Sequence, residues 1–238
     1  MKPSRRRLSA VLMLAGMMLA PSIAAAERPV DLLLVLAVDA SGSVDARRFE
    51  LQQRGYAEAF ANPRILQAIR SGPLGAIAVT MFQWTGPSLQ ARILDWMVIG
   101  DEASANAVAA AIAGTPRQLF RGGTSISGAI DYAVRLFPDS GLTAARRVID
   151  VSGDGANNIG GPVGPARDAA VAAGIVINGL PILALEPNLD AYYRDNVIGG
   201  PGAFVVAVDS FEHFGDAILN KLIAEIAAAP ANLWQAAR

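Results

Sequence analysis

The sequence predicts a three-layer α/β fold, in which helices cover both faces of a doubly wound, mostly parallel sheet of six strands, similar to a Rossmann sheet. Two observations predict it. Apolar runs typical of buried parallel strands alternate with amphipathic helical segments along most of the chain. Loops rich in Gly, Ser and Asp follow several of these runs, as expected where parallel strands end at one edge of such a sheet.

The six strands differ in how strongly their sequences mark them. The run at 30–38 is almost unbroken in its apolar character, which is typical of a central strand. The other strands are expected at 75–82, 91–98, 147–151, 175–180 and 203–208. The connection at 84–87 is short enough for a hairpin, so we expect the strand at 91–98 to be an antiparallel edge strand.

Helices are expected between these strands. Asp45 is a good N-cap for the first helix, and Pro138 ends the helix expected at 125–136. Further helices are expected at 101–113, at 165–173 and at the C-terminal end, where Phe214, Ile218, Leu222 and Ile226 form an apolar stripe.

The N-terminal segment has the pattern of a secretory signal peptide. Basic residues precede an apolar run at 8–20, and small residues follow at 24–26. The run is shorter than the roughly 20 residues of a membrane span. We therefore expect residues 1–26 to be removed and residues 27–238 to form a single domain that is periplasmic or secreted, without a stable membrane span. An uncleaved anchor is the alternative, and the sequence does not choose between the Sec and twin-arginine routes.

Composition excludes several classes of function. Four of the 20 Lys and Arg residues lie in the signal segment and none of the 21 Asp and Glu, so the remaining chain carries a net charge of −5. An acidic chain is a poor nucleic-acid binder. Without cysteine there is no disulfide or thiolate site, and His213 is the only histidine. Any metal is therefore expected to be a hard cation held by oxygen atoms.

Three polar loops supply such oxygen atoms at the carboxyl ends of predicted strands. They contain Asp39, Ser41 and Ser43, then Thr124 after two glycines, then Asp154 followed by Gly155. Magnesium takes six oxygen ligands in near-octahedral geometry and commonly keeps waters, so this set leaves a coordination position for a partner. Taken singly, each loop is also explained by helix capping or by turn formation.

Together these motifs resemble the metal-ion-dependent adhesion site of von Willebrand factor A (vWA) domains. The resemblance rests on Val38-Asp39-Ala40-Ser41-Gly42-Ser43, Gly123-Thr124 and Asp154-Gly155, and it extends over about 30–227. It implies that Asp39, Ser41, Ser43, Thr124 and Asp154 coordinate a divalent cation, Mg²⁺ with Mn²⁺ as the alternative. It also implies that a protein partner supplies a carboxylate to complete the metal shell.

Within that family, the sequence is most similar to an exported bacterial subgroup known as domain of unknown function 1194. The cues include Val-Ile-Gly-Gly-Pro-Gly-Ala-Phe at 197–204. One feature departs from many relatives, which have Thr or Ser directly before Asp-Gly where this chain has Gly153. Asp150 is thereby a rival to Asp154 as metal ligand. Asp150 lies earlier in its strand and should point elsewhere, so Asp154 remains the expected ligand.

Three functions are compatible with this reading. The first is a binding module that meets an acidic residue of a protein partner through the metal. The second is a metal-assisted hydrolase, but Asp45 and Asn157 are poor candidates for its general base and no Gly-x-Ser-x-Gly motif is present. The third is a structural domain with an unused site. Trp84 and the segment 192–194 could contact a ligand, although core packing explains them equally well.

Overall fold

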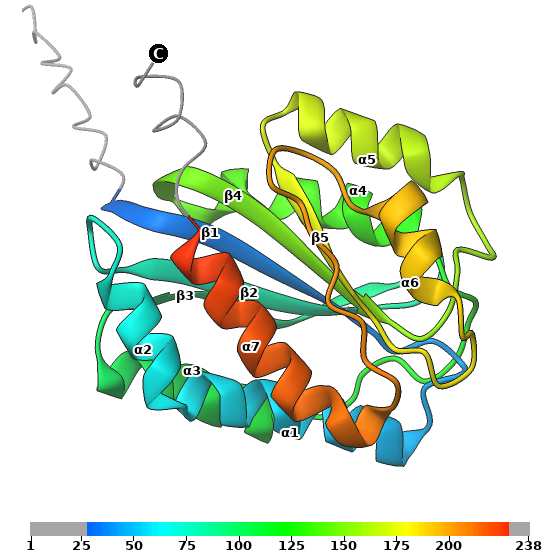
Figure 1. Cartoon of the computed structure of the whole chain (residues 1–238), viewed down its shortest axis with the longest axis horizontal. Coiled ribbons are helices and arrows are strands. Elements are labelled where there is room, and N and C mark those ends of the chain that lie inside the picture. Colours follow the sequence, from blue (N-terminus) through cyan, green and yellow to red (C-terminus); the bar gives the residue numbers. More distant parts are fainter. Residues whose placement is uncertain (1–27, 229–238) are drawn as a thin grey trace, which may run out of the picture.

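The computed structural model describes residues 28–228 and contains one α/β domain (Figure 1). The signal peptide expected at 1–26 lies outside the described residues. Between residues 28 and 228, no helix has both the length and the apolar character needed to cross a membrane.

A five-stranded sheet forms the middle layer, in the order β3-β2-β1-β4-β5. Its strands are β1 (Arg28–Asp39), β2 (Ile77–Trp84), β3 (Gln90–Ile99), β4 (Leu142–Gly153) and β5 (Val176–Pro181). All neighbouring strands are parallel except β2 and β3, which form the expected hairpin with β3 at the edge. The central position of the apolar strand β1 is confirmed. Strand β4 starts earlier than predicted because it pairs with β1 from Leu142 onward, opposite Arg28.

The sixth predicted strand, at 203–208, is wrong as a regular strand. This segment runs beside β5 but pairs with it only through isolated bridges, Gly179 to Val205 and Ile182 to Val208. Asn178 gives the physical reason. Its side-chain Oδ1 accepts the hydrogen bond of the Phe204 amide at 2.9 Å, so this backbone donor does not join a strand ladder.

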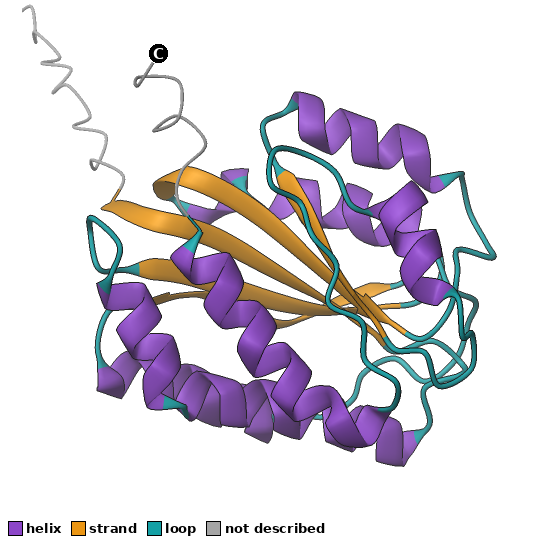
Figure 2. Cartoon of the chain, viewed as in Figure 1, coloured by secondary structure: helices purple, strands orange, loops and turns teal. Residues whose placement is uncertain are grey.

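Helices cover both faces of the sheet (Figure 2). One face carries α1 (Ala46–Ala61), α2 (Pro63–Arg70), α3 (Glu102–Gly114) and α7 (Phe214–Ala227), and the other carries α4 (Ile126–Leu136) and α5 (Val163–Ala172). The short α6 (Leu189–Tyr192) continues into a wider helical turn, Tyr193–Val197. Short 3₁₀ turns occur at Pro138–Ser140 and Phe211–His213. The predicted three-layer α/β architecture is therefore confirmed, with five regular strands in place of six.

Strand β1 shows why the two layers of helices form. Its side chains alternate between the faces, so Leu32, Leu34 and Leu36 pack into the core under α1 and α7. Their neighbours Leu33 and Val35 pack into the second core, under α4 and α5. A strand that is apolar on both faces is buried only if helices cover both of them.

A buried ionic cluster joins α7 to the sheet. Lys221 Nζ lies 2.6 Å from Asp150 Oδ1 and 2.7 Å from Glu225 Oε1, and all three side chains are fully buried. Asn178 Nδ2 donates a hydrogen bond to the same Glu225 oxygen at 2.9 Å. The carboxylate of Asp150 is thus held by an ion pair with Lys221 of the C-terminal helix α7.

Candidate metal centre

The three polar loops meet at the carboxyl edge of the sheet, on the right in Figure 1. The first follows β1, the second leads into α4, and the third follows β4. β1 lies between β2 and β4, so the loop after β1 is central. The backbone joins the first two loops, since the amide of Gly42 donates to the carbonyl of Gly122 at 3.1 Å.

Four of the five predicted ligands form a continuous hydrogen-bonded chain. The Asp39 carboxylate accepts the Ser41 amide at 2.7 Å. The hydroxyls of Ser41 and Ser43 are 3.1 Å apart. Ser43 Oγ then donates to Asp154 Oδ1 at 2.5 Å, joining loops 111 residues apart in sequence. The structure therefore brings these side-chain oxygens together.

Thr124, the fifth predicted ligand, lies beside the Asp154 loop. Its side chain is buried, with 4% of its surface exposed. Thr124 Oγ1 is 3.5 Å from the position that a Cβ of Gly155 would occupy. The amide of Thr124 donates to Asn158 Oδ1 at 2.8 Å, and its carbonyl accepts the Asn158 amide at 2.9 Å. These two bonds hold the start of α4 against the loop after β4.

Burial shapes the electrostatics of the two carboxylates. Burial, and next the charge of Asp154, raise the pKa of Asp39 from its ordinary value to about 7. Burial also raises the pKa of Asp154, opposed by the hydrogen bond from Ser43 and the charge of Arg48. Two adjacent carboxylates at a buried edge repel each other, and a cation between them relieves that repulsion.

Gly153, the departure noted in the sequence, has a steric role. A Cβ at this position would lie 2.9 Å from Asp39 Oδ2 and 3.0 Å from Tyr193 Oη. Only glycine leaves this space for the Asp39 carboxylate. The rival ligand Asp150 is held by Lys221, as described above, while Asp154 reaches Ser43.

Gly122 is a second position near the site where only glycine fits. Its φ of 120° is rarely adopted by L side chains, and a Cβ there would contact the hydroxyl of Thr85. That hydroxyl donates toward the carbonyls of Arg121 and Gly123, at 3.1 and 2.9 Å. The loop that carries Thr124 is therefore fixed to the end of β2.

Sequence reasoning missed several residues that surround these ligands. Arg48 donates to the Ser43 carbonyl at 2.7 Å and lies 3.6 Å from Asp154 Oδ2. Arg117 donates to the Ala40 carbonyl at 3.0 Å. Glu186 Oε2 accepts the Ala156 amide at 3.1 Å. Helical spacing could have placed Arg48 one turn after the first loop, but no local signal connects Arg117 or Glu186 with it.

The donors among the five predicted ligands are all oxygens, and two of these ligands are carboxylates. In residues 28–228, no group of three or more His, Cys, Asp or Glu side chains could hold a metal ion. Three hydroxyls and two carboxylates suit a hard cation such as Mg²⁺, which also retains waters. Asp39 Oδ2 and Asp154 Oδ2 are buried and have no hydrogen-bond partner among the described residues. The donor set therefore fits a hard divalent cation.

The candidates for a general base or a ligand-contacting rim, and the single histidine, are engaged in structural contacts. Asp45 caps α1 by accepting the Arg48 amide at 2.8 Å, and Asn157 Oδ1 accepts the Ser127 amide at 3.1 Å. His213 is exposed and pairs with Asp209 at 2.7 Å. Trp84 is fully buried, so it belongs to the core and not to a ligand-contacting rim.

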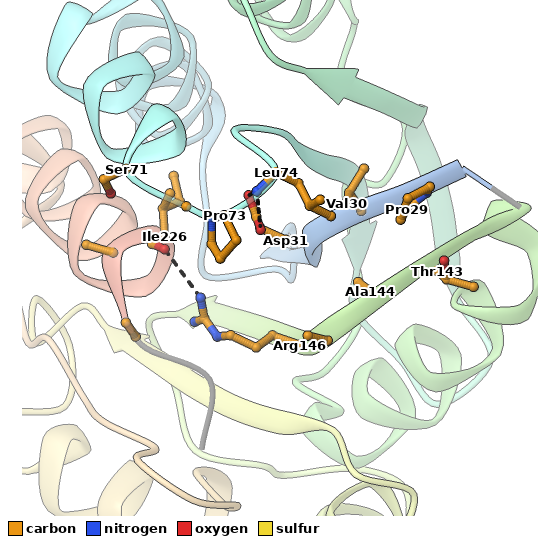
Figure 3. Close-up of a pocket in the computed structure, with 14 residues that line it drawn as sticks. Pro29, Val30, Asp31, Ser71, Pro73, Leu74, Thr143, Ala144, Arg146 and Ile226 are labelled. Carbon is orange, nitrogen blue, oxygen red and sulfur yellow. Dashed lines mark hydrogen bonds between the residues drawn. The ribbon is translucent and has the colours of Figure 1, made fainter. Parts of the chain in front are cut away.

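A cavity of about 510 Å³ lies at the opposite, amino edge of the sheet (Figure 3). Its two charged side chains, Asp31 and Arg146, are already engaged. Asp31 accepts the Leu74 amide at 3.0 Å, and Arg146 donates to the Ile226 carbonyl at 3.3 Å. The cavity is lined at one side by Ala228, the last described residue. It shares no lining residue with the three polar loops.

Solved structures similar to this chain share its fold. One is proximal thread matrix protein 1 from the mussel byssus, described with a zinc-occupied MIDAS (metal-ion-dependent adhesion site) motif, at 15% identity and a TM-score of 0.58, with 83% of this chain and 46% of that chain covered. Another is the pilus adhesin SpaC of Lactobacillus rhamnosus GG, at 15% and 0.58, with 83% and 31% covered. A third is a von Willebrand factor type A protein from Catenulispora acidiphila, at 16% and 0.55, with 83% and 43% covered.

These likenesses define the class of fold. The chain has a von Willebrand factor A fold, and it spans less than half the length of each of these three structures. Residues 29–230 match the family described as "Protein of unknown function (DUF1194)", and the chain belongs to that family. No curated protein matches the chain.

Proposed function

We propose that this protein is an exported binding module that holds a divalent cation at the carboxyl edge of its sheet and meets an acidic residue of a protein partner through that cation. Asp39, Ser41, Ser43, Thr124 and Asp154 hold the cation, some directly and some through water. When bound, the metal supplies an electrophilic centre for an incoming carboxylate. The five residues hold and orient that centre at the edge of the sheet.

The observation that carries this proposal is the state of the two edge carboxylates. Asp39 and Asp154 are buried, and each has one oxygen without a hydrogen-bond partner among residues 28–228. Buried polar atoms are nearly always paired. Asp150 and Glu225 also have unpaired oxygens, but Lys221 lies beside them, whereas no lysine of the described residues lies beside the two edge carboxylates, whose free oxygens therefore call for a ligand. Three hydroxyls lie beside them. Oxygen donors of this kind suit hard cations such as magnesium and manganese.

The carboxylate of the partner follows from the open coordination position. The two carboxylates balance the +2 charge of the cation, so a further anion binds as the ligand that fills this position, and an acidic side chain is the anionic oxygen ligand that proteins offer. Arg48 lies next to Asp154 and adds positive charge at the same place.

Export is proposed from the signal-like segment at 1–26.

Calorimetry tests the metal site directly. Mg²⁺ and Mn²⁺ are titrated into purified protein that lacks residues 1–26, its proposed mature form. We expect one site in the wild type and its loss in Asp39→Asn and Asp154→Asn. The control is Asp95→Asn, which removes a carboxylate whose side chain is 89% exposed on β3. If the wild type binds neither Mg²⁺ nor Mn²⁺, the proposal is contradicted.

A further inference from the structure

We infer that the partner of this protein presents its acidic residue between large apolar side chains, which dock on an apolar rim formed by Leu89, Phe120, Ile159 and Leu185. This inference rests on the proposed function and adds the chemistry of the partner segment. It is carried by the distribution of exposed apolar side chains in the described structure.

Five large hydrophobic side chains are well exposed among residues 28–228, and four of them form this rim. The exposed fractions are 52% for Leu89, 63% for Phe120, 46% for Ile159 and 51% for Leu185. The fifth, Leu74, lines the cavity at the opposite edge. Single exposed apolar residues need no explanation, but their concentration around one site is typical of protein interaction surfaces.

Two rim residues are tied directly to the candidate metal loops. The Ile159 amide donates to the Thr124 carbonyl at 3.4 Å, and Ile159 Cγ2 lies 2.9 Å from where a Cβ of Gly123 would stand. Arg117 lies with its guanidinium 5.3 Å from the ring centre of Phe120. The same guanidinium donates to the Ala40 carbonyl, so Phe120 stands beside the loop after β1.

The other two rim residues approach from the outer strands. Leu185 precedes Glu186, whose carboxylate accepts the Ala156 amide in the loop after β4. The Leu89 carbonyl accepts the Thr85 amide at 3.1 Å, and Thr85 Oγ1 bonds to the Gly123 carbonyl. The rim therefore draws one side chain from each of four loops at the carboxyl edge.

The charges within the rim favour a partner whose acidic residue is central. Arg48 faces Asp154, and Arg121 is exposed in the loop next to Phe120. Glu186 is the opposing charge, and its carboxylate is engaged with a backbone amide. A carboxylate aimed at the metal and flanked by Leu, Ile, Phe or Val would match both the charge and the apolar surroundings.

A peptide library tests this inference. The probe is a set of synthetic peptides with a fixed central Asp or Glu and two varied positions on each side, bound to the purified protein in Mg²⁺ and again in EDTA. We expect metal-dependent binding that selects large apolar residues over Ser and Gly at the flanks by about tenfold, equivalent to about 1.4 kcal/mol. The double variant Phe120→Ser/Ile159→Ser should lose this selection and keep its calorimetric metal affinity.

The control is Leu74→Ser, which removes an equally exposed leucine at the opposite edge and should leave the selection unchanged. Metal-dependent binding without apolar selection overturns the inference and leaves the proposed function standing. Equal loss of selection in Leu74→Ser also overturns it. Absence of any metal-dependent peptide binding, in protein that binds Mg²⁺ by calorimetry, overturns both the inference and the proposed role of a partner carboxylate.

Discussion

Two pairs of buried carboxylates lie at different places in this domain, and the chain treats them differently. In the interior, Asp150 and Glu225 are both within 2.7 Å of the ammonium of Lys221. At the sheet edge, Asp39 and Asp154 are bonded to hydroxyls and amides, and the nearest guanidinium group is 3.6 Å from Asp154. The chain supplies a cation of its own to the first pair and oxygen ligands to the second.

This difference separates a structural role from the proposed binding role. Lys221 is one of only two lysines in the sequence, and the other is Lys2 in the predicted signal segment. Apart from His213, the remaining basic residues are arginines. The compact ammonium is used where three side chains must fit in a closed core. An ion pair sealed in the core has a fixed partner, whereas carboxylates at a loop edge can exchange theirs.

The largest expected effect is on the interior pair. Lys221→Met removes the cation and leaves two buried carboxylates, which should lower the free energy of unfolding by about 3–5 kcal/mol. Urea denaturation measures it. The triple variant Lys221→Met/Asp150→Asn/Glu225→Gln has no buried charge at this place and should regain much of the loss. A Lys221→Met protein as stable as wild type would contradict the stabilising role of Lys221 and hence the difference between the two pairs.

The second effect is on the edge pair. If Mg²⁺ binds only the folded protein, a concentration 100 times its Kd should raise the free energy of unfolding by about 2.7 kcal/mol. Urea denaturation with Mg²⁺ or with EDTA measures this difference. It should vanish in Asp154→Asn and persist in Asp95→Asn. A metal effect of equal size in Asp154→Asn would place the cation elsewhere.

A third, smaller effect comes from the space beside Asp39. Gly153→Ala puts a Cβ 2.9 Å from Asp39 Oδ2, which should weaken Mg²⁺ binding and cost about 1–3 kcal/mol of stability through overpacking. Calorimetry and denaturation measure the two quantities. The matched control is Gly161→Ala, because a Cβ at Gly161 meets nothing within 4 Å. Similar behaviour of the two variants would show that Gly153 has no special role.

Over a single pH unit, the smallest effect is a pH dependence of the metal-free protein. The pKa of Asp39 is about 7 in the folded protein and near its ordinary value of 3.8 when unfolded. A raised acid pKa stabilises the fold at low pH, and this contribution declines as pH rises from about 4 to 7. In EDTA, the free energy of unfolding, measured by urea denaturation, should fall by about 1 kcal/mol more in wild type than in Asp39→Asn between pH 5 and 6. Parallel pH profiles of the two proteins would contradict this.

The fold was predictable because its signals are local. The apolar run of β1 and the N-cap Asp45 each act through neighbours in sequence. The helix α2 was missed, although Asn62 caps it and Pro63 starts it, because it follows α1 without a loop. The sixth strand was overpredicted because its composition suits a strand, while the side chain of Asn178, far away in sequence, takes one of its amides.

The candidate site was predictable in part for the same reason. Its polar loops follow strands, and parallel strands bring their carboxyl ends to one edge. Nothing local reveals that Ile159 stands beside Thr124, or that Phe120 lies near the loop after β1. Such neighbours depend on how separate loops pack, so the apolar rim emerges only from the folded structure.

The distance in sequence between Ser43 and Asp154 also has a consequence for how the protein folds. The loops that these residues join are 111 residues apart, and the β1 and β4 strands that carry them pair in parallel over the same long interval. Folds dominated by contacts between such distant segments fold slowly. No partly synthesised or partly folded chain that lacks β4 can contain the whole ligand set. The proposed cation site is therefore complete only once β4 lies beside β1, so metal binding at that site would report this pairing.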